Sequence, residues 1–233
     1  MNREDRMNEY VSKLDKMVEV MFPAVGVKCL IRMVDLPIEM DHPVEVRDSG
    51  IHGKGLFATR FIPKGKAVTL YPMHAVINRN EPAPGPPGSF FTYGDQMPDM
   101  KMYRFDVGHR KLAYVGNPNK QVAGYLGHFM NDGYPHTDRL KDGSFEEVWR
   151  YLHAEQKCNN CVYTKGSYLV SITTMKDVQP GEELTVAYSP FYWIQSNRTP
   201  EEIIEGYTSK QKSRMVHFYQ QRTRLETIQQ PNR

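Results

Sequence analysis

Short segments of alternating apolar and polar residues, separated by turns that contain glycine or proline, constrain the fold of this chain most. Val44–Arg47 alternates in this way, and the turn Phe61–Lys66 precedes a further segment at 67–71. Later segments of the same kind lie at 103–107, 111–115, 162–163 and 168–172. Strands this short and this closely spaced are typical of a small β-rich core. The sequence therefore predicts a mostly β fold built from several short strands.

The segment 181–193 is predicted to contain a short strand that carries a tyrosine. Leu184, Val186 and Tyr188 alternate with smaller or polar residues. Ser189–Pro190 ends the strand because proline has no N–H to give to a ladder. The strand either is an ordinary core strand with a half-buried tyrosine or delivers the Tyr188 hydroxyl into a site, and the segment alone leaves both interpretations open.

Helices are predicted on both sides of the strands and between them. Apolar residues recur at three- and four-residue steps over 3–22, and Pro23 is expected to end that helix. We favour its packing on the main domain over a role in dimerisation. A second helix is predicted over 144–157, and a third begins at Pro200 with Thr199 as its N-cap.

Two stretches lack a periodic pattern. Residues 24–43 form an irregular connector, and 78–100 contain the run Glu81–Gly88, whose prolines and glycines exclude a helix or a central strand. We expect 78–100 to be a surface loop.

Composition excludes several classes of protein. The chain has 233 residues, of which 39% are hydrophobic and 24% charged, and no apolar run approaches the roughly 18 residues of a membrane span. The charged N-terminal residues lack an apolar core, so no secretory signal is predicted. The net charge of +3 demands neither an acidic nor a basic partner. We expect an intracellular protein, in the nucleus or the cytoplasm, without membrane contact.

Three cysteines cannot form a disulfide framework, and an odd count favours a reducing compartment. Cys158 and Cys161 form a Cys-x-x-Cys pair, but a structural zinc site needs four ligands. Cys29 is distant in the sequence, and His153 would be only a third ligand. We therefore predict no metal and interpret the pair as two small, partly buried thiols.

Two further segments contain residues suited to close backbone contacts. His52–Gly55 has two glycines one residue apart, which allow positive φ or close approach to a ligand, although a hairpin turn alone would explain them. A dinucleotide fingerprint is excluded because the third glycine is missing and a strand follows. Asn131 and Asp132 suit a tight turn because their side chains bond to nearby backbone.

The order of these segments resembles that of the SET-domain protein-lysine methyltransferases. The motifs concerned are His-Gly-Lys-Gly-Leu-Phe-Ala at 52–58, Phe-Met-Asn-Asp-Gly at 129–133, Asn160–Cys161, and Gly-Glu-Glu-Leu-Thr followed by a tyrosine at 181–188. The resemblance implies a mostly β (α+β), β-clip-like fold of small sheets, flanked by N- and C-terminal helices. It also implies a pseudoknot in which 128–133 and the strand ending at Tyr188 thread past each other. The parts of the chain are then an N-terminal helix and connector at 1–43, the SET domain at 44–193 with an insertion at about 72–124, and a helical extension at 194–233.

The resemblance also implies a function: transfer of a methyl group from S-adenosyl-L-methionine to the ε-amine of a protein lysine, on a histone tail or another protein. Tyr188 matches the catalytic tyrosine of the family. The cofactor-binding residues implied are His52, Gly53, Lys54, Gly55, Asn131, Asp132, Tyr188 and Trp193. Those implied for the channel of the substrate lysine are Val186, Tyr125 and Phe191.

The chain departs from the family pattern at three points. Asp132 replaces the histidine of an Asn-His-Ser segment, which puts cofactor affinity in question. Val186 stands where members usually carry Phe or Tyr, and this favours higher methylation states. The cysteine cluster that some members carry after the domain is absent, so the lid over the cofactor is assigned to 191–193 and the tail helix.

Two other functions stay open. The chain would be a binding module if the SET fold had lost catalysis, and Asp132 and Val186 favour that reading. It would be a chromatin or nucleic-acid adaptor if the basic residues from Lys210 to Arg224 form a binding surface, although the default is a solvated face. Nucleic acid is not required for the enzyme, and a homo-oligomer is compatible with the sequence.

Overall fold

The structure is a computed structural model that describes residues 5–25, 42–78, 90–92, 104–107, 112–166, 168–194 and 200–229. The expectations for most of the connector, for the run Glu81–Gly88, and for Cys29 and Thr199 concern residues outside these ranges. Within them, no helix combines the length and the apolar character that crossing a membrane requires. The chain forms two compact units, residues 1–133 with 159–186 and residues 134–158 with 187–233, and each is described by itself.

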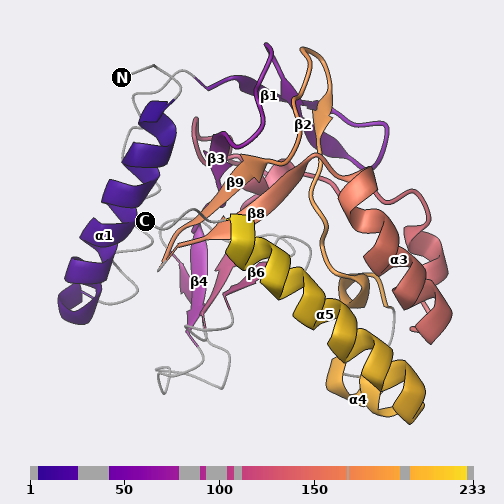
Figure 1. The fold of residues 1–233 in the computed structure, drawn as a ribbon. Coiled ribbons are helices and arrows are strands. Elements are labelled where there is room, and N and C mark those ends of the chain that lie inside the picture. The colour runs from indigo at the N-terminus through magenta and orange to yellow at the C-terminus, as the bar shows by residue number, and fades with distance from the viewer. Residues whose placement is uncertain are drawn as a thin grey trace. The chain divides into compact units, whose positions relative to one another are not determined.

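Three small antiparallel sheets make up the first unit (Figure 1). The first sheet has the order β1-β2-β10, with strands Val44–Asp48, Lys54–Ala58 and Glu183–Leu184. The second has the order β3-β9-β8, with strands Ala67–Leu70, Val170–Thr174 and Cys161–Lys165. The third has the order β5-β4-β7-β6, with strands Phe90–Thr92, Ala75–Asn78, Leu112–Val115 and Arg104–Val107. The predicted mostly β class of small sheets is confirmed.

Sheet centres coincide with the apolar, β-branched segments. β9 lies between β3 and β8, and four of its five residues are buried. Val170 and Ile172 on this strand are 1% and 0% exposed. Branched side chains of this kind pack well on a pleated, buried surface, which explains why this segment occupies the middle of its sheet.

The expected loop at 78–100 is wrong in one part. Phe90–Thr92 forms β5, which pairs with β4 in an antiparallel register from Ala75↔Thr92 to Ile77↔Phe90. Only three residues pair, and their partner precedes the proline-rich run. A segment this short carries too little local pattern to be recognised without its partner strand.

The expected strand at 184–188 is also shorter than predicted. β10 ends at Leu184, and Thr185 instead forms a parallel bridge with Asn131. Leu184, Thr185 and Val186 are all buried, so the alternation in the sequence does not correspond to one inward and one outward face. The segment is enclosed on both sides because it runs beside residue 131, as the implied threading requires.

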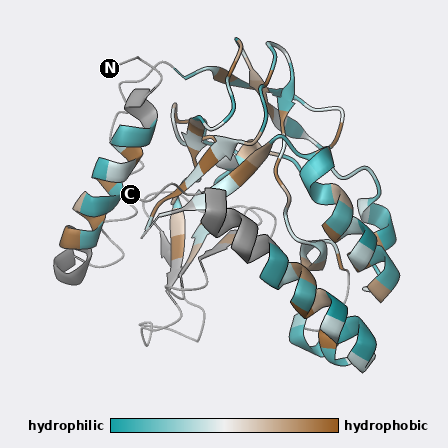
Figure 2. Cartoon of the chain, in the orientation of Figure 1, coloured by the Kyte–Doolittle hydropathy of each residue, from teal (hydrophilic) through white to brown (hydrophobic). Residues whose placement is uncertain are grey.

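Helix α1, Asp5–Val25, packs on the first unit as expected, with Leu14 and Val18 buried. Asp15 fixes it there, because its Oδ1 accepts the backbone N–H groups of Tyr168 at 2.7 Å and Leu169 at 2.9 Å. Figure 2 shows hydrophilic and hydrophobic residues alternating along this helix. The helix continues two residues past Pro23, which was expected to end it.

Helices dominate the second unit. α3, Phe145–Cys158, agrees with the prediction for 144–157. The tail forms two helices, α4 at Pro200–Glu205 and α5 at Ser209–Gln229, because the backbone turns at 206–208 and Thr208 and Gln211 cap α5 reciprocally. The buried core of this unit consists of Tyr134, Leu140, Phe145, Val148, Tyr151, Leu152 and Met215.

Candidate functional site

The turn that joins β1 to β2 is a closed loop with one glycine in the left-handed region. The backbone N–H of Ser49 donates to the carbonyl oxygen of Gly53 at 2.8 Å. Gly53 has a φ of 50°, a backbone conformation that residues with a side chain rarely adopt. A Cβ placed on Gly53 would meet nothing within 4 Å. The turn is therefore shaped by its glycine and leaves open space beside its backbone.

The second glycine of the turn has a different role. A Cβ on Gly55 would lie 2.3 Å from Oε1 of Glu183, which is far inside van der Waals contact. Glycine at this position therefore makes room for a carboxylate that lies against the backbone of β2. The sequence indicated the need for close approach, but it did not show that the approaching group belongs to this chain.

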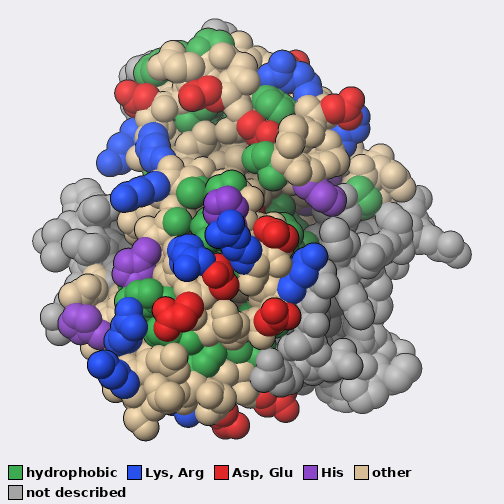
Figure 3. Space-filling model, turned by 90° about the vertical axis from the view of Figure 1, so that its right-hand side faces the viewer, with side chains coloured by type: hydrophobic (Ala, Val, Ile, Leu, Met, Phe, Trp, Pro, Cys, Tyr) green, Lys and Arg blue, Asp and Glu red, His purple; other side chains and the backbone are tan. Residues whose placement is uncertain are grey.

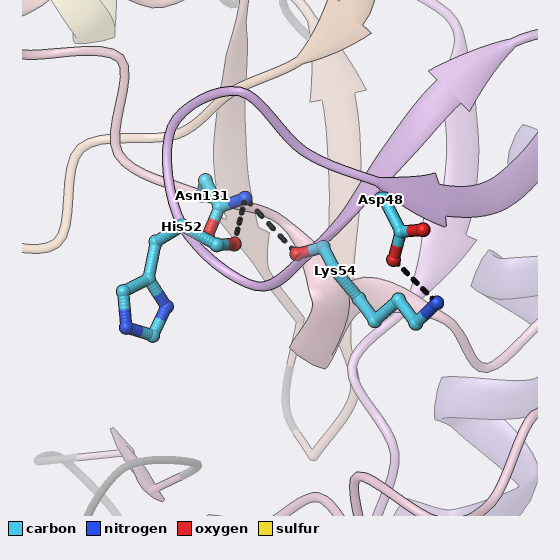
Figure 4. A network of polar contacts seen from close by, with 4 residues as sticks. All are labelled: Asp48, His52, Lys54 and Asn131. Carbon is cyan, nitrogen blue, oxygen red and sulfur yellow. Dashed lines mark hydrogen bonds and ion pairs between the residues drawn. The ribbon is translucent and has the colours of Figure 1, made fainter.

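Asn131 connects the turn to the segment on its other side. Its Nδ2 donates to the carbonyl oxygens of His52 and Lys54, each at 3.0 Å, and to Oε1 of Glu183 at 2.9 Å. Figure 4 shows the amide pointing at both carbonyls, while the imidazole of His52 is directed away from it. The side chain of Asn131 is only 7% exposed. Four residues of the predicted cofactor set, His52–Lys54 and Asn131, thus lie together through backbone groups and one amide.

Lys54 lies at the edge of the turn. Its Nζ is 2.6 Å from Oδ1 of Asp48, and the side chains are 53% and 88% exposed (Figure 4). An ion pair this exposed adds little stability. The bond that joins Lys54 to Asn131 is made by the carbonyl oxygen of Lys54.

Two asparagines between α3 and β8 hold the threaded segments. Asn160 donates from Nδ2 to the carbonyl of Glu183 and accepts the N–H of Thr185 at Oδ1, both at 2.9 Å. Asn159 accepts the N–H of Gly133 at 2.8 Å, and its Nδ2 is 3.5 Å from Oδ1 of Asp132. Asp132, at the position of the expected histidine, is only 2% exposed. Asn160 thus bonds Glu183 and Thr185 as a neighbouring strand would, and Asn159 fixes Gly133.

Sequence reasoning missed Ser49, Glu183, Asn159 and Asn160 as functional residues. Asn160 and Glu183 enter the sequence prediction only as parts of motifs. The one local signal was the presence of small or amide side chains, which favour backbone bonding, next to the predicted turns.

Two of the residues expected in the lysine channel lie in the first unit. Val186 is 1% exposed, and its N–H donates to the carbonyl of Asn131 at 2.9 Å. Tyr125 is 0% exposed. Both are interior residues, and the backbone of Val186 is fixed beside Asn131.

Tyr188 lies in an aromatic cluster of the second unit. Its ring stacks on Trp193, with centroids 5.7 Å apart and an angle of 9°, and meets Tyr192 edge-on at 4.8 Å. Ser189 follows with a φ of 104°, and its N–H donates to the hydroxyl of Tyr151 at 3.3 Å. A non-glycine residue in this region is strained, and such strain often marks functional segments. Phe191 packs partly buried against the core of this unit.

Two buried histidines lie near the segment that leads to Asn131. His74 and His128 meet edge-on at 5.6 Å. Burial lowers the pKa of His74 to about 4, and burial together with His74 lowers the pKa of His128 to about 3. Both rings are therefore neutral near pH 7. The N–H of Asn117 donates to Nδ1 of His74, and Nε2 of His128 lies 3.0 Å from the Asn117 carbonyl, so the pair serves to hold the backbone.

The cysteine pair has no metal-binding geometry among the residues that the structure describes. Cys158 and Cys161 form no disulfide, and no group of three or more His, Cys, Asp or Glu side chains in the described ranges could hold an ion. Burial raises the pKa of the Cys161 thiol, so this sulfur stays protonated and unreactive.

Comparison with known proteins gives the family. Residues 53–189 match the SET domain, and because the match covers more than half of the chain, the chain belongs to the SET-domain family. SET domains are in general S-adenosylmethionine-dependent lysine methyltransferases. A solved structure of a Plasmodium falciparum protein, described as a "putative histone methyltransferase", is similar at 12% identity and a TM-score of 0.37, over 64% of this chain and 96% of that one. No curated protein sequence matches this chain.

Proposed function

We propose that this chain transfers a methyl group from S-adenosyl-L-methionine to the ε-amine of a lysine in a protein substrate. The observation that carries the proposal is the turn 49–55, held by Asn131, in a chain of the SET-domain family. A histone tail is the first substrate to test, because histone tails are the usual targets of the family that the motifs resemble.

The residues at the turn fit this cofactor. The space beside Gly53 lets a ligand approach the backbone, and the carbonyl oxygens of His52 and Lys54 are acceptors suited to an ammonium group. The residues that would hold the cofactor are His52, Gly53, Lys54, Gly55, Asn131, Asp132, Tyr188 and Trp193. When bound, it supplies a methyl group on a cationic sulfonium.

The acceptor lysine must lose its proton before it can attack, although a free lysine has a pKa of about 10.4. We assign Val186, Tyr125 and Phe191 to the channel that receives it. Low exposure of Val186 and Tyr125 supports this assignment, since a water-poor channel disfavours the ammonium form and lowers the pKa of the amine.

Tyr188 is assigned the catalytic role. Its hydroxyl would orient the neutral amine and, with backbone carbonyls, accept polarised C–H contacts worth about 0.5–1 kcal/mol each. The stacking on Trp193 supports the assignment because it restricts the ring to one orientation. Alignment of this kind can contribute roughly 7–11 kcal/mol to lowering a barrier, so no acid–base pair is needed.

A binding module without catalysis is the second candidate. The buried carboxylate of Asp132, at the position where the family carries histidine, is the observation that favours it. No observation favours the adaptor that acts through basic residues. On the face shown in Figure 3, Lys and Arg side chains lie among Asp and Glu side chains.

Two measurements test the proposal. Calorimetry with S-adenosylmethionine should show binding, and incubation with methyl-labelled cofactor and histones, or a protein library, should place label on lysine. Binding without label on any substrate would favour the module, and a protein that does not bind the cofactor would contradict the enzyme.

A further inference from the structure

The carboxylate of Glu183 is the centre of the hydrogen bonds around the turn. The hydroxyl of Ser49 lies 2.8 Å from Oε1 and 2.9 Å from Oε2, and Nδ2 of Asn131 lies 2.9 Å from Oε1. Ser49 and Glu183 are 134 positions apart in the sequence, so this contact closes the turn against a strand from the far end of the first unit.

The carboxylate reaches both sides of the turn. Through Ser49 it is connected to the N–H groups, since Oγ of Ser49 accepts from Ile51 at 2.9 Å and from His52 at 3.4 Å. Through Asn131 it is connected to the carbonyl groups of His52 and Lys54. One side chain therefore fixes the donors and the acceptors of the same loop.

The position of the carboxylate is itself fixed. Glu183 pairs with Phe57 across the sheet, and its carbonyl oxygen accepts from Asn160 at 2.9 Å. The space over Gly55 holds the carboxylate, because any larger residue at 55 would overlap Oε1. Backbone pairing thus fixes the main chain of Glu183, the missing Cβ leaves room for its carboxylate, and the bonds from Ser49 and Asn131 hold the carboxylate there.

We propose that Glu183 is a positioning residue: without touching the cofactor, it sets the conformation of 49–55 and through it the affinity for S-adenosylmethionine. The assignment to the cofactor rests on the proposed function, whereas the ordering of the turn does not. A carboxylate suits this role because it only accepts hydrogen bonds, and both of its partners donate to it.

The variant Glu183→Gln changes this chemistry with little change of shape. Its amide nitrogen would replace either Oε2, which lies 2.9 Å from the Ser49 hydroxyl, or Oε1, which accepts from Asn131, so one acceptor of the carboxylate is lost. The matched control is Glu182→Gln, at the neighbouring exposed glutamate, whose carboxylate accepts the backbone N–H of Gln179.

Hydrogen exchange of the protein without cofactor is the first readout. Amides at 49–55 should exchange at least ten-fold faster in Glu183→Gln than in the wild type, whereas Glu182→Gln should match the wild type and both variants should keep their melting temperature within a few degrees. Unchanged exchange at 49–55 in Glu183→Gln would overturn the proposal.

Cofactor affinity is the second readout. Binding of S-adenosylhomocysteine, measured by calorimetry, should weaken at least ten-fold in Glu183→Gln, and the KM for S-adenosylmethionine should rise while kcat at saturation changes less than three-fold. An equal fall in kcat with an unchanged KM would contradict a positioning role. If the wild type binds neither compound, the proposed function fails, and exchange alone decides the role of Glu183.

A double variant checks the geometry. Gly55→Ala should disturb exchange and binding in the wild-type background, because the new methyl group meets the carboxylate. In the Glu183→Ala background, Gly55→Ala should have a clearly smaller effect on exchange and binding. The carboxylate that the new methyl group would meet is then absent, and only Cβ of Ser49, at 3.0 Å, is near. Additive effects of the two changes would show that the carboxylate does not lie over Gly55.

Discussion

The backbone N–H of Val186 donates to the carbonyl oxygen of Asn131 at 2.9 Å, beside a parallel bridge between Asn131 and Thr185. Two segments far apart in the sequence thus run side by side, one carrying the amide that holds the glycine turn and the other the carboxylate that this amide contacts. Because a single pairing aligns both, changes at either segment should alter the same turn.

Replacing Asn131 by alanine or by aspartate should lower the stability of the protein to different degrees. Asn131→Ala leaves the carbonyls of His52 and Lys54 without this donor, and the loss of a typical hydrogen bond costs roughly 0.5–1.5 kcal/mol. Asn131→Asp should be worse, because a carboxylate would face Glu183. Urea denaturation measures both, and an aspartate variant as stable as the wild type would contradict the network.

Gly53 should tolerate asparagine better than alanine. Its φ of 50° lies in the left-handed region, where alanine costs about 1–2 kcal/mol and asparagine less. Gly50 provides the control, because its added Cβ also meets nothing but its φ is not positive, so Gly50→Ala should cost much less. The test is the free energy of unfolding of each variant. Equal losses of stability in Gly53→Ala and Gly50→Ala would exclude backbone strain as the cause.

Tyr188→Phe should lose methyl transfer by at least about ten-fold, which corresponds to about 1.4 kcal/mol of barrier, because the hydroxyl is gone while the ring remains. Stacking on Trp193 needs only the ring, so the fold and the affinity for S-adenosylhomocysteine should persist. Label transfer and calorimetry on the same preparation test this. Unchanged turnover would remove Tyr188 from the chemistry.

Val186 should permit multiple methylation. Valine is smaller than the Phe or Tyr that the resembling family usually carries there, and it lacks a hydroxyl to hold a water. Mass spectrometry of a methylated substrate should show di- or trimethyl-lysine, and Val186→Phe should shift the product toward monomethyl-lysine. A strictly monomethyl product from the wild type would contradict this expectation.

Stability should fall in mild acid because of the buried histidines. The folded-state pKa values of about 4 for His74 and about 3 for His128 lie below the ordinary 6.5, so between pH 6.5 and 4 the unfolded chain binds protons that the folded chain does not. For each ring, the free energy of unfolding then falls by a slope approaching about 1.4 kcal/mol per pH unit. The contribution of the neutral rings to stability is fully present above pH 6.5 and is lost as the pH falls.

Urea unfolding at several pH values measures that slope. His74→Asn keeps an acceptor at the Nδ1 position for the Asn117 N–H and removes one titrating group, so its slope between pH 6 and 5 should be smaller. A variant with the wild-type slope would show that His74 does not titrate on unfolding.

The structure confirms those sequence predictions that depend only on residues close together in the sequence. Val44–Asp48, Lys54–Ala58 and α3 lie close to where alternation or helical periodicity placed them. Two of the differences from the sequence predictions have a common cause. Phe90–Thr92 is a strand only because Ala75–Ile77 pairs with it, and the segment after Leu184 is buried on both sides only because Asn131 runs beside it.

The sequence by itself determined the short strands, the helices and the family, because these depend on local periodicity and on the order of motifs along the chain. Tertiary structure decided which polar groups meet: that Gly55 makes room for Glu183, and that Ser49 and Asn131 share its carboxylate. Hydrogen bonds that join residues 52 and 134 positions apart have no local pattern, so their partners are fixed only when the packed core brings the strands together.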